Sequence, residues 1–201
     1  MRTAFVFGIF FALGACTATV VPEIEPPQTV PDAVPVKKKA VPAFPSDSFA
    51  PVKPVAQYVT EQQAGLSAAV KGTSLKLRRE SNTLILTMAG KAAFRPNSYN
   101  MNAGAVNDLK KIAPVLRYFD KTRINVVGHV SETAGIKEPT ARLLSEKRAD
   151  SAASVLVGAG VPAVRFWIDG KGFDVPLASA DTEAGRNKND RIEFILTPTI
   201  R

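Results

Sequence analysis

Proline is the feature that most strongly limits where this chain can fold. Nine of the 15 prolines lie between Pro22 and Pro54, four of them directly after a valine. Proline has no backbone N–H and a fixed φ, so this stretch suits neither a helix nor the interior of a sheet. Its composition favours extended polyproline II, a semi-rigid spacer that rises about 3.1 Å per residue. We expect a tether here, with a docking peptide as the alternative, and a folded domain elsewhere in the chain.

The N-terminus has the pattern of an export signal. One early arginine precedes an apolar run over residues 4–13, which is too short to cross a bilayer. Two small residues stand directly before Cys16, as a lipoprotein signal peptidase requires. Cys16 is the only cysteine, so no disulfide can form within the chain. We expect residues 1–15 to be a lipoprotein signal peptide and Cys16 to carry lipid, with a plain secretory signal as the alternative. Thr17 resembles the pattern of lipoproteins anchored in the outer membrane and facing the periplasm.

The formal net charge of +8 limits the partners of an exported chain. Phosphate-rich lipid surfaces and the anionic cell wall are the polyanions available there, and a basic surface favours both. We expect no nucleic-acid partner.

The sequence after the proline-rich stretch predicts a region with regular secondary structure. Residues 16–72 are assigned to the lipid-anchored tether, with a short helix over 60–71, and residues 73–201 to a folded domain. Apolar residues alternate in four stretches, and spacings of three and four predict two helices between them. The predicted strands lie around Leu75–Leu77, Leu84–Met88, Arg123–His129, Val164–Ile168 and Ile192–Leu196, with helices from Asn102 to Phe119 and from Pro139 to Gly158.

The order of these elements defines the fold class. A β-hairpin is followed by helix, strand, helix, strand and strand. We expect an α+β domain, a mixed β-sheet with helices packed on one side.

Five short motifs follow one another along this domain. They are Gly128-His129, Leu144-Ser145 with Arg148-Ala149, Gly160-Val161, Gly170-Lys171-Gly172, and Gly185-Arg186 with Asn189 and Arg191. Together they resemble the OmpA-like C-terminal domain family, of the peptidoglycan-associated-lipoprotein type, over residues 84–196. The usual family pattern is G-H-T-D, N-x-x-L-S-x-x-R-A, G-I or G-V, G-x-G and G-R-x-x-N-R-R-V. The resemblance implies non-covalent binding of peptidoglycan through the diaminopimelate of its stem peptide.

Arg148 is the central candidate for binding. The resemblance implies that it grips a carboxylate of the ligand, which a guanidinium can do bidentately. From the residues alone, Arg148 continues an apolar helical stripe, so it needs an anionic ligand or an ion pair with a neighbouring carboxylate. His129, Arg186 and Asn189 occupy further family positions that border the site.

The chain departs from the family pattern at the ligand motif. Val130 and Ser131 stand where the family has T-D, so the carboxylate for the ammonium of the ligand is missing from its usual place. Glu132 is the nearest replacement. Asn189-Asp190-Arg191 replaces N-R-R at the second departure.

Two functions remain after these observations. The first is an outer-membrane lipoprotein that binds peptidoglycan and tethers the membrane, or an envelope complex, to the cell wall. The second is a structural subunit of a trans-envelope secretion or pilus machine that uses the domain to dock other subunits. We expect no enzyme and no catalytic residues, since His129, Ser131 and Glu132 are nearly contiguous rather than arranged as a triad. One histidine and one cysteine predict neither a metal site nor a cofactor.

Overall fold

A mixed five-stranded sheet forms the centre of the computed structural model, which describes residues 54–132 and 136–200. Its strand order is β1-β2-β5-β3-β4. The last strand in the sequence therefore lies in the middle, antiparallel to both of its neighbours, whereas β3 and β4 run parallel. The strands are β1 (Leu75–Glu80), β2 (Thr83–Ala89), β3 (Thr122–His129), β4 (Phe166–Gly170) and β5 (Arg191–Pro198).

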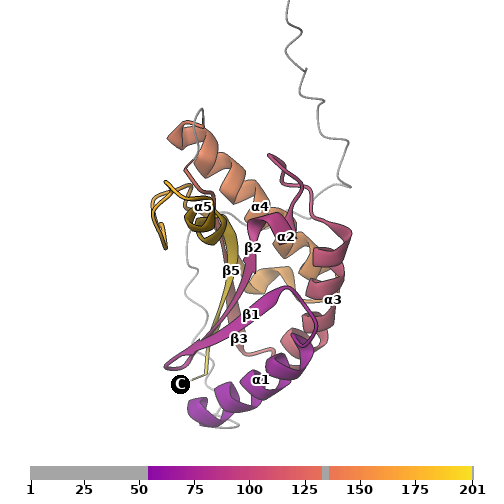
Figure 1. Ribbon diagram of the computed structural model, residues 1–201. Coiled ribbons are helices and arrows are strands. Elements are labelled where there is room, and N and C mark those ends of the chain that lie inside the picture. Colours follow the sequence, from indigo (N-terminus) through magenta and orange to yellow (C-terminus); the bar gives the residue numbers. More distant parts are fainter. Residues whose placement is uncertain (1–53, 133–135, 201) are drawn as a thin grey trace, which may run out of the picture.

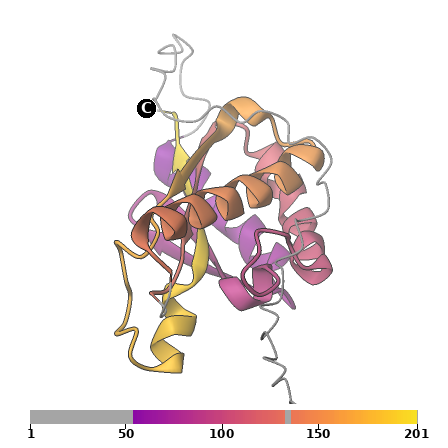
Figure 2. The ribbon, with the colours of Figure 1, turned by 90° about the horizontal axis from the view of Figure 1, so that it is seen from above.

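Three long helices pack on one face of this sheet. The helices are α1 (Val55–Ala69), α2 (Gly90–Ala93), α3 (Ala103–Tyr118), α4 (Glu138–Gly158) and α5 (Glu183–Asn189), with a 3-10 turn at Ala163–Arg165. Apolar side chains of α1, α3 and α4 form a single core with alternate strand residues such as Leu86, Val126 and Phe194. Figure 2 shows α4 crossing the strands. The predicted α+β architecture is confirmed.

The short helices α2 and α5 lie at the end of the sheet that carries the candidate site. Figure 1 shows both at the end of the sheet where β2 ends and β5 begins, whereas α1 lies towards the other end. Val130 and Ser131 after β3, residues of α4 and the junction of α5 with β5 meet here and line one hollow. The sequence analysis predicted neither of these two short helices.

The folded part extends further towards the N-terminus than expected. The predicted helix over residues 60–71 is α1, and it begins at Val55. Leu66 is fully buried in the core, and the Tyr58 hydroxyl lies 3.1 Å from that of Thr122 at the start of β3. Because α1 contributes to the core, residues 55–69 belong with the domain that we had begun at residue 73.

Two further points complete the fold. Val164, predicted as a strand residue, lies in the 3-10 turn and is 71% exposed, so β4 begins two residues later. The predicted signal peptide, Cys16 and the proline-rich stretch up to residue 53 lie outside the described residues. Within the described residues, no helix is long and apolar enough to span a membrane.

Candidate functional site

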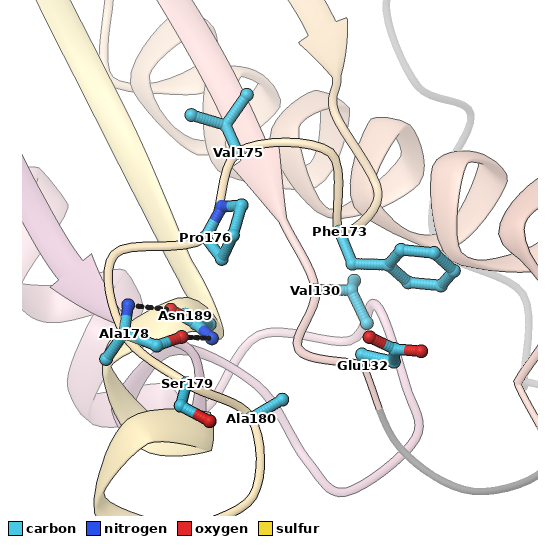
Figure 3. Close-up of a pocket in the computed structure, with 9 residues that line it drawn as sticks. All are labelled: Val130, Glu132, Phe173, Val175, Pro176, Ala178, Ser179, Ala180 and Asn189. Carbon is cyan, nitrogen blue, oxygen red and sulfur yellow. Dashed lines mark hydrogen bonds between the residues drawn. The ribbon is translucent and has the colours of Figure 1, made fainter.

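Two hollows lie side by side where β3 ends, and Val130 lines both of them. We call the larger one, of about 260 Å³, the arginine hollow; its polar lining residues include Lys91, Arg95, Ser131, Arg148 and Asp190. We call the smaller one, of about 140 Å³, the Phe173 hollow; it is lined by Glu132, Phe173, Pro176, Ser179 and Asn189 among others. Figure 3 shows the Phe173 hollow.

Arg148 reaches the arginine hollow from the middle of α4. The residue is only 5% exposed, and its guanidinium lies over the ring of Phe94 at 5.0 Å. Nε donates to the Ser98 carbonyl at 2.9 Å, and Nη1 donates to Asp190 Oδ1 at 2.7 Å. Nη2 makes no hydrogen bond with any described residue. The ion pair expected from the residues alone is therefore present, and one edge of the guanidinium still has donors for a ligand.

Asp190 is the functional residue that sequence reasoning missed. It stands between α5 and β5, with its side chain 29% exposed. A Cβ on Gly90 would come within 2.4 Å of Asp190 Cγ, so this carboxyl group needs glycine at position 90. Burial raises the pKa of Asp190, and the charge of Arg148 opposes that rise. The signal in the sequence was the acidic residue within Asn189-Asp190-Arg191.

Ser131 and Glu132 point to different hollows. Ser131 is buried and lines the arginine hollow together with Arg148, so the structure brings these two predicted residues together. Glu132 is exposed and lines the Phe173 hollow, where Figure 3 shows it beside Phe173. Glu132 is therefore not among the residues that share a hollow with Arg148.

Asn189 and Arg186 hold the loop before α5. Asn189 Oδ1 accepts from the backbone N–H groups of Leu177 and Ala178 at 2.7 and 3.0 Å, and its Nδ2 donates to the Ala178 carbonyl at 2.8 Å. Arg186 Nη1 donates to the carbonyls of Ala180 and Asp181. These bonds give both predicted residues a role in shaping the wall of the Phe173 hollow.

His129 lines neither hollow. It is 4% exposed, it stands opposite Arg191 on the neighbouring strand, and Nε2 lies 3.9 Å from Glu193 Oε2. Neither ring nitrogen makes a hydrogen bond with a described residue. Burial, reinforced by the charge of Arg191, lowers the pKa of His129 to about 4. The imidazole is therefore neutral at pH 7 and sits in the sheet rather than in a binding hollow.

The comparisons with known proteins found one matching family model and similar lipoproteins. The model described as "OmpA family" matches residues 93–190, a range that includes Ser131, Arg148 and Asp190. The "Probable lipoprotein YiaD" of Escherichia coli is 35% identical over 144 residues, which is 72% of this chain and 65% of that protein. The "Outer-membrane lipoprotein YfiB" of Pseudomonas aeruginosa is 35% identical over 109 residues, which is 54% of this chain and 64% of that protein. The chain thus spans less than two thirds of the length of either relative.

A solved structure supports the fold. The cell wall anchor of the T6SS from Pseudomonas aeruginosa superposes with a TM-score of 0.59 at 22% identity, covering 72% of this chain and 97% of that one. At this identity the likeness concerns the fold alone.

Proposed function

We propose that this chain is an outer-membrane lipoprotein with a domain of the OmpA family, and that this domain binds peptidoglycan without a covalent bond. Domains of this family are not enzymes, which agrees with the absence of a catalytic pattern in the sequence. The protein would hold the outer membrane, or an envelope complex, to the cell wall from the periplasmic side.

One observation carries this proposal: a buried arginine presents unused donors to an open hollow. Arg148 is fixed by Ser98, Asp190 and the ring of Phe94, so its guanidinium is already oriented before a ligand arrives. An oriented guanidinium loses little side-chain entropy on binding a carboxylate. Lys91 and Arg95 line the same hollow and add positive charge. The site therefore favours an anionic group on a small ligand.

The ligand that we propose is the diaminopimelate of the stem peptide. Its side chain ends in an ammonium and a carboxylate on one carbon atom, so it needs a donor and an acceptor close together. The arginine hollow offers both, in Arg148 and Asp190.

The anchor and the tether would place this domain at the wall. Lipid on Cys16 would fix the N-terminus in the outer membrane. A polyproline II segment over residues 22–54 would span roughly 100 Å at a rise of about 3.1 Å per residue. The excess of positive charge favours the anionic wall.

A docking subunit of a trans-envelope secretion or pilus machine is the second candidate. The observation that favours it is the ion pair itself, because Arg148 Nη1 already donates a hydrogen bond to Asp190. A site that satisfies its own arginine can serve packing without any ligand.

Sedimentation of the purified domain with isolated sacculi tests the proposal. Arg148→Ala should reduce the pelleted fraction, with an affinity loss of roughly tenfold or more, since a hydrogen bond to a charged group contributes about 1.5–3 kcal/mol. Arg142→Ala is the matched control on the same helix, because Arg142 is half-exposed and pairs with Glu138 and Asp174 outside the hollow. Its pelleted fraction should equal that of the wild type.

Two outcomes would reject specific binding of peptidoglycan in the arginine hollow. Wild type that stays in the supernatant even at low salt would favour the docking subunit instead. Equal losses for Arg148→Ala and Arg142→Ala would show that general positive charge holds the domain on the wall. A melting curve of each variant separates lost binding from lost folding, because removing Arg148 leaves Asp190 without its partner.

A further inference from the structure

The arginine hollow contains a carboxylate, but at position 190 and not at position 131, where it was expected. Position 131, which follows β3, carries a serine, whereas Asp190, between α5 and β5, lines the same hollow. Of the described residues that line this hollow, Asp190 alone is acidic, and three are basic: Lys91, Arg95 and Arg148. Any ammonium group that enters the hollow therefore meets its countercharge at Asp190.

Asp190 keeps one oxygen available while it pairs with Arg148. Oδ1 accepts from Arg148 Nη1 at 2.7 Å, and Oδ2 makes no hydrogen bond with a described residue. Arg148 likewise keeps Nη2 unused among the described residues. The ion pair thus presents one acceptor and one donor next to each other, which matches a group with an ammonium and a carboxylate on the same carbon.

The fold builds a specific place for this carboxyl group. Gly90, the first residue of α2, donates its backbone N–H to the Asp190 carbonyl at 2.7 Å. Its missing side chain leaves the space that Asp190 fills, since a Cβ there would lie 2.4 Å from Cγ. The backbone contact and the missing Cβ together fix both the position and the direction of the carboxylate.

We infer that Asp190 is the ammonium acceptor of this domain and takes the part that an acidic residue at position 131 would otherwise play. The ligand is an amino-acid head group, with its ammonium on Asp190 Oδ2 and its carboxylate on Arg148 Nη2. This inference rests on the proposed binding of peptidoglycan and names the residue that selects the ammonium end of the stem peptide.

Calorimetric titration with two soluble probes tests the inference. One probe is a muramyl tripeptide that ends in meso-diaminopimelate, and the other is the same peptide acetylated on the side-chain amine. The wild type should bind the free amine about tenfold or more tightly than the acetylated one, as expected for losing one charged hydrogen bond. Asp190→Asn should bind both probes equally and weakly.

Two further variants locate the acceptor. Glu132→Gln is the matched control, because Glu132 lines the other hollow, and it should keep the wild-type preference. Adding Ser131→Asp to Asp190→Asn should restore a preference for the free amine, because Ser131 lines the same hollow. Melting temperatures show whether each variant is folded, and the two-probe comparison on the wild type needs no variant.

The outcomes separate this inference from the proposed function. If the wild type binds the free amine tightly and Asp190→Asn keeps the same preference, the acceptor lies elsewhere and only the inference fails. Tighter binding by Asp190→Asn would also overturn it, since Asp190 would then compete with the ligand for Arg148. If the wild type binds neither probe nor sacculi, peptidoglycan binding itself is wrong, and the assignment of Asp190 falls with it.

Discussion

Acid should destabilise the domain through its single histidine. His129 is buried at the end of β3, and no described residue accepts or donates a hydrogen bond at either ring nitrogen. The charged groups around it act in both directions: Arg191 and Lys171 lower its pKa, whereas Glu193 and Asp169 raise it. Burial is the largest cause and decides the result, a pKa of about 4 in the folded state.

The sign and size follow from the two pKa values. In the unfolded chain the pKa is about 6.5, so between pH 6.5 and about 4 the unfolded state binds more protons than the folded one. The stabilisation is complete above pH 6.5 and is lost as the pH falls towards 4. At about 1.4 kcal/mol per pH unit, the free energy of unfolding should decrease by about 3 kcal/mol over this range.

Urea unfolding at a series of pH values measures this loss. His129→Phe keeps a ring but has no titrating nitrogen. Between pH 6.5 and about 4, its free energy of unfolding should therefore fall by about 3 kcal/mol less than that of the wild type. At pH 7 the two free energies should be similar. The chain contains one histidine, so the imidazole signal in a proton NMR titration of untagged protein reports this group alone. A titration midpoint near 6.5, or an equal pH dependence in His129→Phe, would refute the reasoning.

Three other predictions concern the anchor, the tether and the packing of β3. Cys16→Ser should move the mature protein out of the detergent phase in a partitioning assay; unchanged partitioning would place the anchor elsewhere. Deleting about ten residues within 22–53 should leave the melting temperature of the domain unchanged, and a clear drop would show that this stretch packs on the domain. Gly128→Ala should cost about 1–3 kcal/mol in chemical unfolding, because its Cβ would lie 2.0 Å from the Ser145 carbonyl oxygen. Gly158→Ala, which meets nothing within 4 Å, should cost nothing.

Local patterns in the sequence predicted most elements of the fold. Alternation of apolar residues predicted four of the five strands, because one face of the sheet is buried under helices. This pattern could not predict that β5 lies in the middle of the sheet, because apolar residues alternate in a central strand as they do in an edge strand. Helix α1 was assigned to the tether because it follows the prolines directly. The role of its apolar residues and of Tyr58 is seen only from their contacts with α3 and Thr122 in the folded structure.

The site was half predictable for a similar reason. Arg148 stood out because a guanidinium interrupts an apolar helical stripe, a local signal. Its partner lies 42 residues away in the sequence, and no periodicity joins the two. Glu132, predicted as the replacement carboxylate for the ammonium of the ligand, follows Ser131 in the chain but lines the other hollow.

The two departures from the family pattern make physical sense together. A serine at position 131 alone would leave Arg148 buried without a countercharge, and an uncompensated buried charge typically costs about 3–5 kcal/mol. An acidic residue at both 131 and 190 would instead place two carboxylates in one hollow and raise the pKa of one of them. With Ser131 and Asp190 the hollow keeps a single carboxylate, and this carboxylate pairs with its arginine. The altered motif therefore places the countercharge of Arg148 at position 190 and not at position 131. For this reason, the missing carboxylate at position 131 is weaker evidence for a lost ligand than the sequence alone suggested.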